Sequence, residues 1–178
     1  MSIIAKNADG KDFKQISAGT VQAVCVDIWD IGLQEKEWQG KKFKQHQVVL
    51  AFEVAETADE GPFAGNRMTI SKFYTLSLSE KANLRKDLEG WRGKSFTESE
   101  LEGFDLEKLI GSNCMLNIVY NKKGKAKISG ISKLMAGLSP LIPETKRRVP
   151  DWVKGLRERS DLYNDNPEAE VEDDSVAF

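Results

Sequence analysis

Cysteine and histidine are scarce in this chain, with two cysteines and one histidine among 178 residues. Cys25 and Cys114 lie in apolar runs typical of buried strands, where a thiol behaves as a small hydrophobe. With no second histidine and no cysteine nearby, His46 has no partners for a zinc-type ligand cluster. We therefore expect a reduced protein without disulfides, and with neither a cofactor nor a metal.

Long apolar runs and phosphate-binding glycine loops are also missing. No run approaches the roughly 18 residues that a membrane-spanning helix needs, and residues 1–6 do not resemble the start of a signal peptide. No glycine-rich loop of the kind that holds nucleotide phosphates occurs. Paired acids such as Glu98 and Glu100 lie in a capping turn, where no pocket would tune their pKa values. The sequence favours a cytoplasmic protein that is not an enzyme and does not bind a membrane.

The net charge of −2 conceals an uneven distribution along the chain. Six of the 28 acidic residues lie in 165–174, and no basic residue follows Asn164. Residues 1–163 therefore carry 26 basic and 22 acidic residues, a net charge of +4. A mildly basic body with an acidic tail is typical of a protein that binds a polyanion, with the tail as a competitor for the same groove.

Five segments are predicted to be β-strands, because they are rich in β-branched and aromatic residues or alternate apolar and polar positions. They are residues 21–31, 45–55, 67–76, 113–120 and 126–134. In the second segment Val48 and Leu50 share one face while Gln47 and Glu53 share the other. We expect that strand to be half exposed.

Helical signals occur between the third and fourth predicted strands. Residues 77–80 fit a capping box and begin a helix over 78–91, and residues 97–100 form a second capping box. A short helical turn is expected over 106–110, and a short amphipathic helix over 150–156. Three strands, helices and then a two-stranded hairpin is the layout of the OB-fold, a five-stranded Greek-key barrel that binds oligonucleotides. Five strands and a helix also fit other small α+β folds.

The domain boundaries follow from these elements. Residues 1–137 are predicted to form an OB-fold nucleic-acid-binding domain, 138–160 a linker with the short helix, and 161–178 a disordered acidic tail. The predicted fold class is therefore mainly β with α, a five-stranded OB-fold Greek-key barrel with a helix between strands three and four, followed by a C-terminal helix and the tail.

Basic and aromatic side chains alternate in both loops that an OB-fold uses for binding. These loops are residues 36–44 and the hairpin turn within 120–127. Lysines pair with phosphates, while aromatic rings stack on unpaired bases at about 1–3 kcal/mol per base. The candidate residues for binding single-stranded DNA are Trp38, Lys41, Lys42, Phe43, Lys44, Lys72, Phe73, Tyr74, Tyr120, Lys122, Lys123, Lys125 and Lys127.

These candidates have structural alternatives. Lysines in hairpin loops are commonly no more than soluble turn residues, and Trp38 or Phe43 would also fit as a lid on the barrel. On the third strand Phe73 shares a face with three hydroxyl residues, but a β-bulge at Lys72 would turn Tyr74 outward in its place.

The chain ends in an acidic run and an aromatic residue. A phenyl ring fills an apolar slot and a terminal carboxylate accepts bidentate hydrogen bonds from arginine, so such a tip fits a basic pocket on another protein. The alternative is an acidic end that is only solvated. The candidate partner-binding residues are Glu172, Asp173, Asp174 and Phe178.

Two similarities to known proteins rest on these residues. The tip resembles the C-terminal tips of bacterial and phage single-stranded DNA-binding proteins, although Val176 and Ala177 stand where the bacterial tip has Ile-Pro. Residues 69–93, which read TISKFYTLSLSEKANLRKDLEGWRG, resemble a family of small phage proteins encoded near replication and recombination genes. The second resemblance covers most of residues 15–135.

The resemblance implies a phage protein in the host bacterial cytoplasm that coats single-stranded DNA. It would recruit replication, recombination or repair enzymes through its tip, and it would form a tetramer as in the bacterial proteins or a dimer as in the phage proteins. The alternative is a phage adaptor or inhibitor that binds host or phage proteins without binding nucleic acid.

Overall fold

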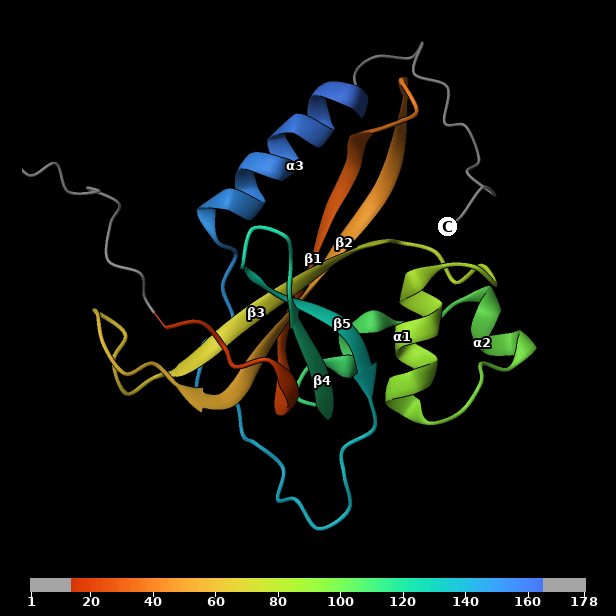
Figure 1. The fold of residues 1–178 in the computed structure, drawn as a ribbon. Coiled ribbons are helices and arrows are strands. Elements are labelled where there is room, and N and C mark those ends of the chain that lie inside the picture. Colours follow the sequence, from red (N-terminus) through yellow and green to blue (C-terminus); the bar gives the residue numbers. More distant parts are fainter. Residues whose placement is uncertain (1–13, 165–178) are drawn as a thin grey trace, which may run out of the picture.

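The computed structural model describes residues 14–164, which form one five-stranded antiparallel sheet with helices around it (Figure 1). The strands are β1 (Gly19–Trp38), β2 (Lys41–Thr57), β3 (Arg67–Thr75), β4 (Asn113–Tyr120) and β5 (Ala126–Ser132). The helices are α1 (Asn83–Arg92), α2 (Glu98–Glu102), the 3₁₀ helix η1 (Leu106–Leu109) and α3 (Asp151–Asn164). All five predicted strands are present, and the fold is mainly β with α, as predicted.

The strand order is β3-β2-β1-β4-β5, so β1 pairs with both β2 and β4. Register shifts at Val26 and Ile31 mark β-bulges in β1. Because a β-bulge bends its strand, β1 can pair with β4 near its start and with β2 along the rest of its length. β3 and β5 approach each other, but no ladder of hydrogen bonds joins them among the described residues. The first amide of β5, at Ala126, donates instead to Oε1 of Gln15 at 2.7 Å. The expected closure into a barrel is therefore wrong.

One face of the sheet packs against α1 and forms the larger core. Leu50 and Phe52 from β2 are fully buried there with Leu88 of α1. Trp91 lies 5.7 Å from the Phe52 ring and donates a hydrogen bond from Nε1 to the carbonyl of Asn113 at 2.8 Å. The apolar face predicted for residues 45–55 is this core face.

Both cysteines are buried in strands, as predicted. Cys25 lies in β1 and Cys114 in β4, and neither forms a disulfide. Burial raises the pKa of the Cys25 thiol to about 12, so the thiolate does not form near neutral pH.

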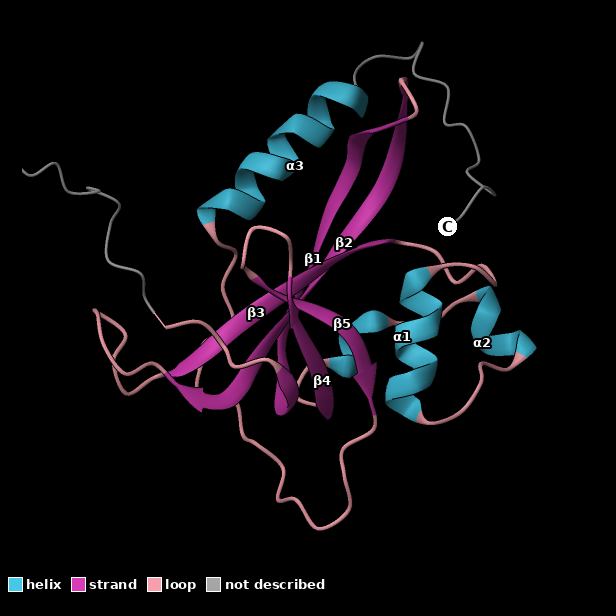
Figure 2. Ribbon diagram, in the orientation of Figure 1, coloured by secondary structure: helices cyan, strands magenta, loops and turns pink. Residues whose placement is uncertain are grey.

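The opposite face of the sheet is buried too, which contradicts the expectation that β2 is half exposed. Val49, Ala51 and Glu53 are all less than 5 % exposed. Residues 138–149, which we call the strap, run across this face without regular secondary structure (Figure 2), and Val153 of α3 packs onto it. The segment predicted to be a linker is therefore part of the folded body.

Side-chain hydrogen bonds fasten the strap to the sheet. Asn113 makes two of them to the backbone of Leu141, at 2.7 and 2.9 Å. Glu53 accepts from the amides of Glu144 and Thr145. Farther along, Trp29 donates to the carbonyl of Arg148, Gln22 to that of Ser139, Arg67 to that of Ile142, and Arg147 donates to Asp27. Each strap carbonyl and amide in this set is satisfied by a residue far away in sequence.

The helices differ from prediction mainly at their ends. α1 begins at Asn83 rather than 78, because Leu76 still donates to the carbonyl of His46 and the Ser77 hydroxyl accepts from Ser79 in a turn. The capping box at Thr97 is present with both of its hydrogen bonds. α3 extends to Asn164, so the domain boundary predicted at residue 160 falls inside a helix.

α3 lies along β1 and β2, where the backbones approach closely. Gly32 has a φ of +68°, and a Cβ at this position would lie 2.0 Å from Oγ of Ser160. Gln34 donates to the carbonyl of Leu156 at 2.9 Å. Only glycine fits at position 32 without moving the helix.

Candidate nucleic-acid interface

The predicted loop at residues 36–44 is instead the end of a two-stranded arm, residues 32–47, in which β1 and β2 stay paired. The turn consists of Gln39 and Gly40 alone, with φ values of +48° and +79°, as a two-residue hairpin turn requires. Trp38 is 44 % exposed beside this turn, and Phe43 is half-buried. The ammonium of Lys42 lies 3.5 Å from the carboxylate of Glu35. The candidate residues here, which also include Lys41 and Lys44, lie on strands rather than in a flexible loop.

The β4–β5 hairpin presents lysines to solvent, as predicted. Asn121 holds the turn by accepting from the amides of Lys123 and Lys125. Tyr120 is 47 % exposed and donates from its hydroxyl to the carbonyl of Ile16. Within residues 14–164, no ion pair involves the exposed lysines of this hairpin, Lys122, Lys123, Lys125 and Lys127.

The register of β3 decides between the two aromatic candidates. β3 pairs with β2 without a shift from Thr69 to Thr75, so no bulge occurs at Lys72. Phe73 is 47 % exposed, whereas Tyr74 is buried and donates to Asp87 at 2.7 Å. The ammonium of Lys72 lies 2.7 Å from the same carboxylate. Lys72 and Tyr74 therefore face α1, away from the face that carries Phe73.

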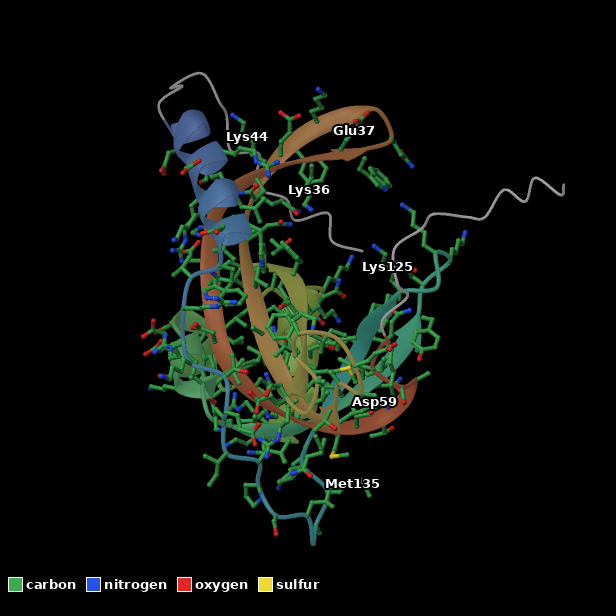
Figure 3. The ribbon with its side chains drawn as sticks, turned by 90° about the vertical axis from the view of Figure 1, so that its left-hand side faces the viewer. Lys36, Glu37, Lys44, Asp59, Lys125 and Met135 are labelled. Atoms are coloured by element: carbon green, nitrogen blue, oxygen red, sulfur yellow. The ribbon has the colours of Figure 1, made fainter. Side chains whose placement is uncertain are left out.

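An open groove of about 1380 Å³ lies between the start of β3, the β4–β5 hairpin, the segment before β1 and the strap. In Figure 3, Lys125 lies on one side of β3, and the arm with Lys36 and Lys44 lies above it. Apolar side chains such as Ile16 and Met68 line part of the groove. Its cations are Lys14, Arg67, Lys125, Lys146 and Arg148. We call this feature the basic groove.

Most of the negative charge in the basic groove is neutralised. Burial alone would raise the pKa of Glu53, but hydrogen bonds from Thr145, Glu144 and Arg67 together lower it, so this carboxyl is ionised. Arg67 lies 3.0 Å from Glu53 and 3.4 Å from the Glu144 carboxylate. Among the described residues, Lys125 forms no ion pair, and the same holds for Lys146 and Arg148 of the strap. The groove therefore presents uncompensated positive charge.

Sequence reasoning found only part of this groove. Of the predicted residues, Lys125 lines it and Phe73 lies on the adjoining face of β3. The cations of the strap were missed because 138–160 was taken as a linker. Residues 146–148, three consecutive basic residues just before Pro150, were the signal that could have found them. The predicted tip residues, from Glu172 to Phe178, lie outside the described part of the chain.

Neither a metal-binding cluster nor a membrane-spanning helix occurs in the described part of the chain. Between residues 14 and 164, no group of three or more histidine, cysteine or acidic side chains could hold a metal ion. No helix in that range is long and apolar enough to cross a bilayer. No protein-family model matches the chain, and no curated protein matches it either.

Proposed function

We propose that the protein binds single-stranded DNA, without sequence preference, in the basic groove and on the adjoining face of β3. The observation that carries this proposal is the combination of unpaired cations from the β4–β5 hairpin and the strap with the half-exposed ring of Phe73. Cations along a groove neutralise phosphates, and an exposed ring stacks on any unpaired base. The role would be to protect exposed strands during phage DNA replication, recombination or repair.

The strand arrangement supports an OB-fold as the finer description of the body. In an OB-fold the ligand crosses the face of β2 and β3 between the β1–β2 and β4–β5 connections. Here those connections are the lysine-bearing arm and hairpin, and helices stand between β3 and β4. In this proposal the OB-fold is an open variant, and part of the groove lies at the unpaired edge between β3 and β5.

The acidic tip is assigned to partner proteins in this proposal. Its carboxylates are repelled by DNA phosphates, which carry the same charge, but suit a basic pocket on a replication or recombination enzyme. The support for this role is the residue pattern of Glu172, Asp173, Asp174 and Phe178.

Fluorescence polarisation with a labelled oligo-dT of about 30 nucleotides tests the proposal. We expect binding to the oligomer that exceeds binding to a duplex of the same length, with a log–log salt slope of about −3 to −5 if roughly five to seven phosphates are neutralised. No retention of oligo-dT at physiological salt, with capture of replication proteins through the tip, would favour the adaptor function instead.

A further inference from the structure

Three aromatic rings meet where α3 joins the sheet. The Trp152 ring packs edge-on against Trp29, with centroids 5.5 Å apart and an interplanar angle of 88°. It also lies 5.9 Å from the ring of Phe73 on β3, tilted by 43°. Trp29 is buried, whereas Trp152 and Phe73 remain 45 % and 47 % exposed. Two neighbouring rings from different parts of the chain therefore present their surfaces to solvent side by side.

The position of Trp152 is fixed by its neighbours. Trp29 is held by the hydrogen bond from its Nε1 to the carbonyl of Arg148 at 3.1 Å. Val153, the next residue of α3, is fully buried between the helix and the sheet. Docking of the helix rests on Val153, on the contact with Trp29 and, farther along, on the hydrogen bond from Gln34 to Leu156. The exposed half of Trp152 contributes nothing to that docking, so it is free to contact a ligand.

The exposed pair adjoins the basic groove. Phe73 shares the outer face of β3 with Thr69, which lines the groove four residues away, a distance of about 13 Å along a strand. Arg148, which also lines the groove, lies four residues before Trp152. The one carboxylate next to Trp152 in sequence, Asp151, lies 3.4 Å from the ammonium of Lys154. A strand bound through its phosphates in the groove would place its bases within reach of the rings.

We propose that Phe73 and Trp152 together form a base-stacking platform at the end of the basic groove, so that α3 is part of the DNA site. This inference rests on the proposed function and assigns its base contacts. Two rigid rings whose positions are set before binding lose little conformational freedom when a base stacks on them. Stacking on a ring does not depend on base identity, which agrees with binding of any sequence.

The test uses the full chain with the substitution Trp152→Leu, which keeps an apolar contact with Trp29 but has no ring. Two probes are compared at equal salt, oligo-dT and an oligomer of abasic sites with the same number of phosphates. We expect W152L to bind oligo-dT between about fivefold and 100-fold more weakly than wild type, and the abasic oligomer equally well. Trp152→Phe restores most of the affinity for oligo-dT.

The control for undocking of the helix is Val153→Ala, which loosens α3 but keeps both rings in the sequence. We expect V153A to weaken binding of the abasic oligomer as well as oligo-dT, because Arg148 of the groove lies only four residues before Trp152 and would shift with the helix. Tryptophan fluorescence gives a second readout in the W38F variant, where Trp29 and Trp91 are buried and oligo-dT should quench Trp152.

Wild-type affinity of W152L for oligo-dT overturns the platform alone, as does an equal loss for both probes. If the wild-type chain binds neither probe, the proposed function fails and the platform fails with it.

Discussion

Among the described residues, Glu53 accepts more hydrogen bonds from the strap than any other. Its carboxylate has no exposed surface, and it accepts from Arg67, from two strap amides and from the Thr145 hydroxyl. A buried carboxylate of this kind is stable only while its partners remain in place. Glu53 therefore links the β-sheet, the strap and the wall of the basic groove.

This carboxylate makes stability depend on pH. The pKa of Glu53 in the folded chain lies below its ordinary value of 4.5. The stabilisation is therefore present above about pH 4.5 and is lost as the pH falls through the folded-state pKa. We expect Glu53→Gln to lower the free energy of unfolding at pH 7 by about 2–4 kcal/mol and to flatten its decline below about pH 4.5, as measured by urea denaturation. Parallel pH profiles for wild type and E53Q would contradict this role.

At the scale of the elements, the strap could not be predicted from sequence. Strands and helices repeat every two or 3.6 residues, and alternation together with β-branched and aromatic content located the five strands. The residue pattern of 97–100 located the capping box at Thr97. The strap has no such period, because its backbone groups bond to side chains that are 28 to 119 residues away in sequence, from Asn113 with Leu141 to Trp29 with Arg148. The buried outer face of β2 was missed for the same reason.

Asn113 tests how far the strap stabilises the fold. We expect Asn113→Ala to lower the free energy of unfolding by about 2 kcal/mol, since two hydrogen bonds to Leu141 are lost and each contributes about 1 kcal/mol. Asn117→Ala is the matched control in the same strand, because the side chain of Asn117 is exposed and donates its hydrogen bond to Ser129 of β5 rather than to the strap. Urea denaturation compares the two, and equal effects would mean that the strap adds little stability.

The strap cations also have a direct test. The double substitution K146E/R148E removes two exposed cations of the groove that make no ion pair with described residues. We expect at least about tenfold weaker binding of oligo-dT, and a salt slope reduced by about 1.4, from two phosphates at 0.7 each.

The control for this variant is K81E/K86E, which changes the net charge equally at exposed residues near or on α1, outside the groove. It should leave the salt slope close to that of wild type. Equal losses in the two variants would show that net charge, and not the groove, governs affinity.

At the scale of the whole molecule, the sequence predicts how much positive charge the body carries but not where that charge gathers. The basic body and acidic tail were evident from composition, because charge is additive along the chain. The place where the positive charge gathers was not evident, since Lys125 and Arg148 meet only through the fold. The sequence predicts Lys125 as a DNA-binding residue because it lies in the hairpin turn. The open edge between β3 and β5 depends on which distant strands pair, and local sequence patterns do not reveal that pairing.

The acidic tail is expected to compete with DNA for the basic groove. Deleting residues 170–178 should tighten oligo-dT binding a few-fold at 50 mM salt and hardly at all at 300 mM, because screening shortens the reach of surface charges. The same deletion should abolish capture of partner enzymes. Titrations at the two salt concentrations check this, and weaker DNA binding after deletion would contradict the competition.

The central claim is that single-stranded DNA lies in the basic groove and against the face of β3. Photocrosslinking of the full chain to oligo-dT, with the crosslinked peptides located by mass spectrometry, tests it most directly. We expect crosslinks within residues 63–73, 120–127 and 144–152. Crosslinks concentrated in α1 and α2, with none in these three segments, would contradict it.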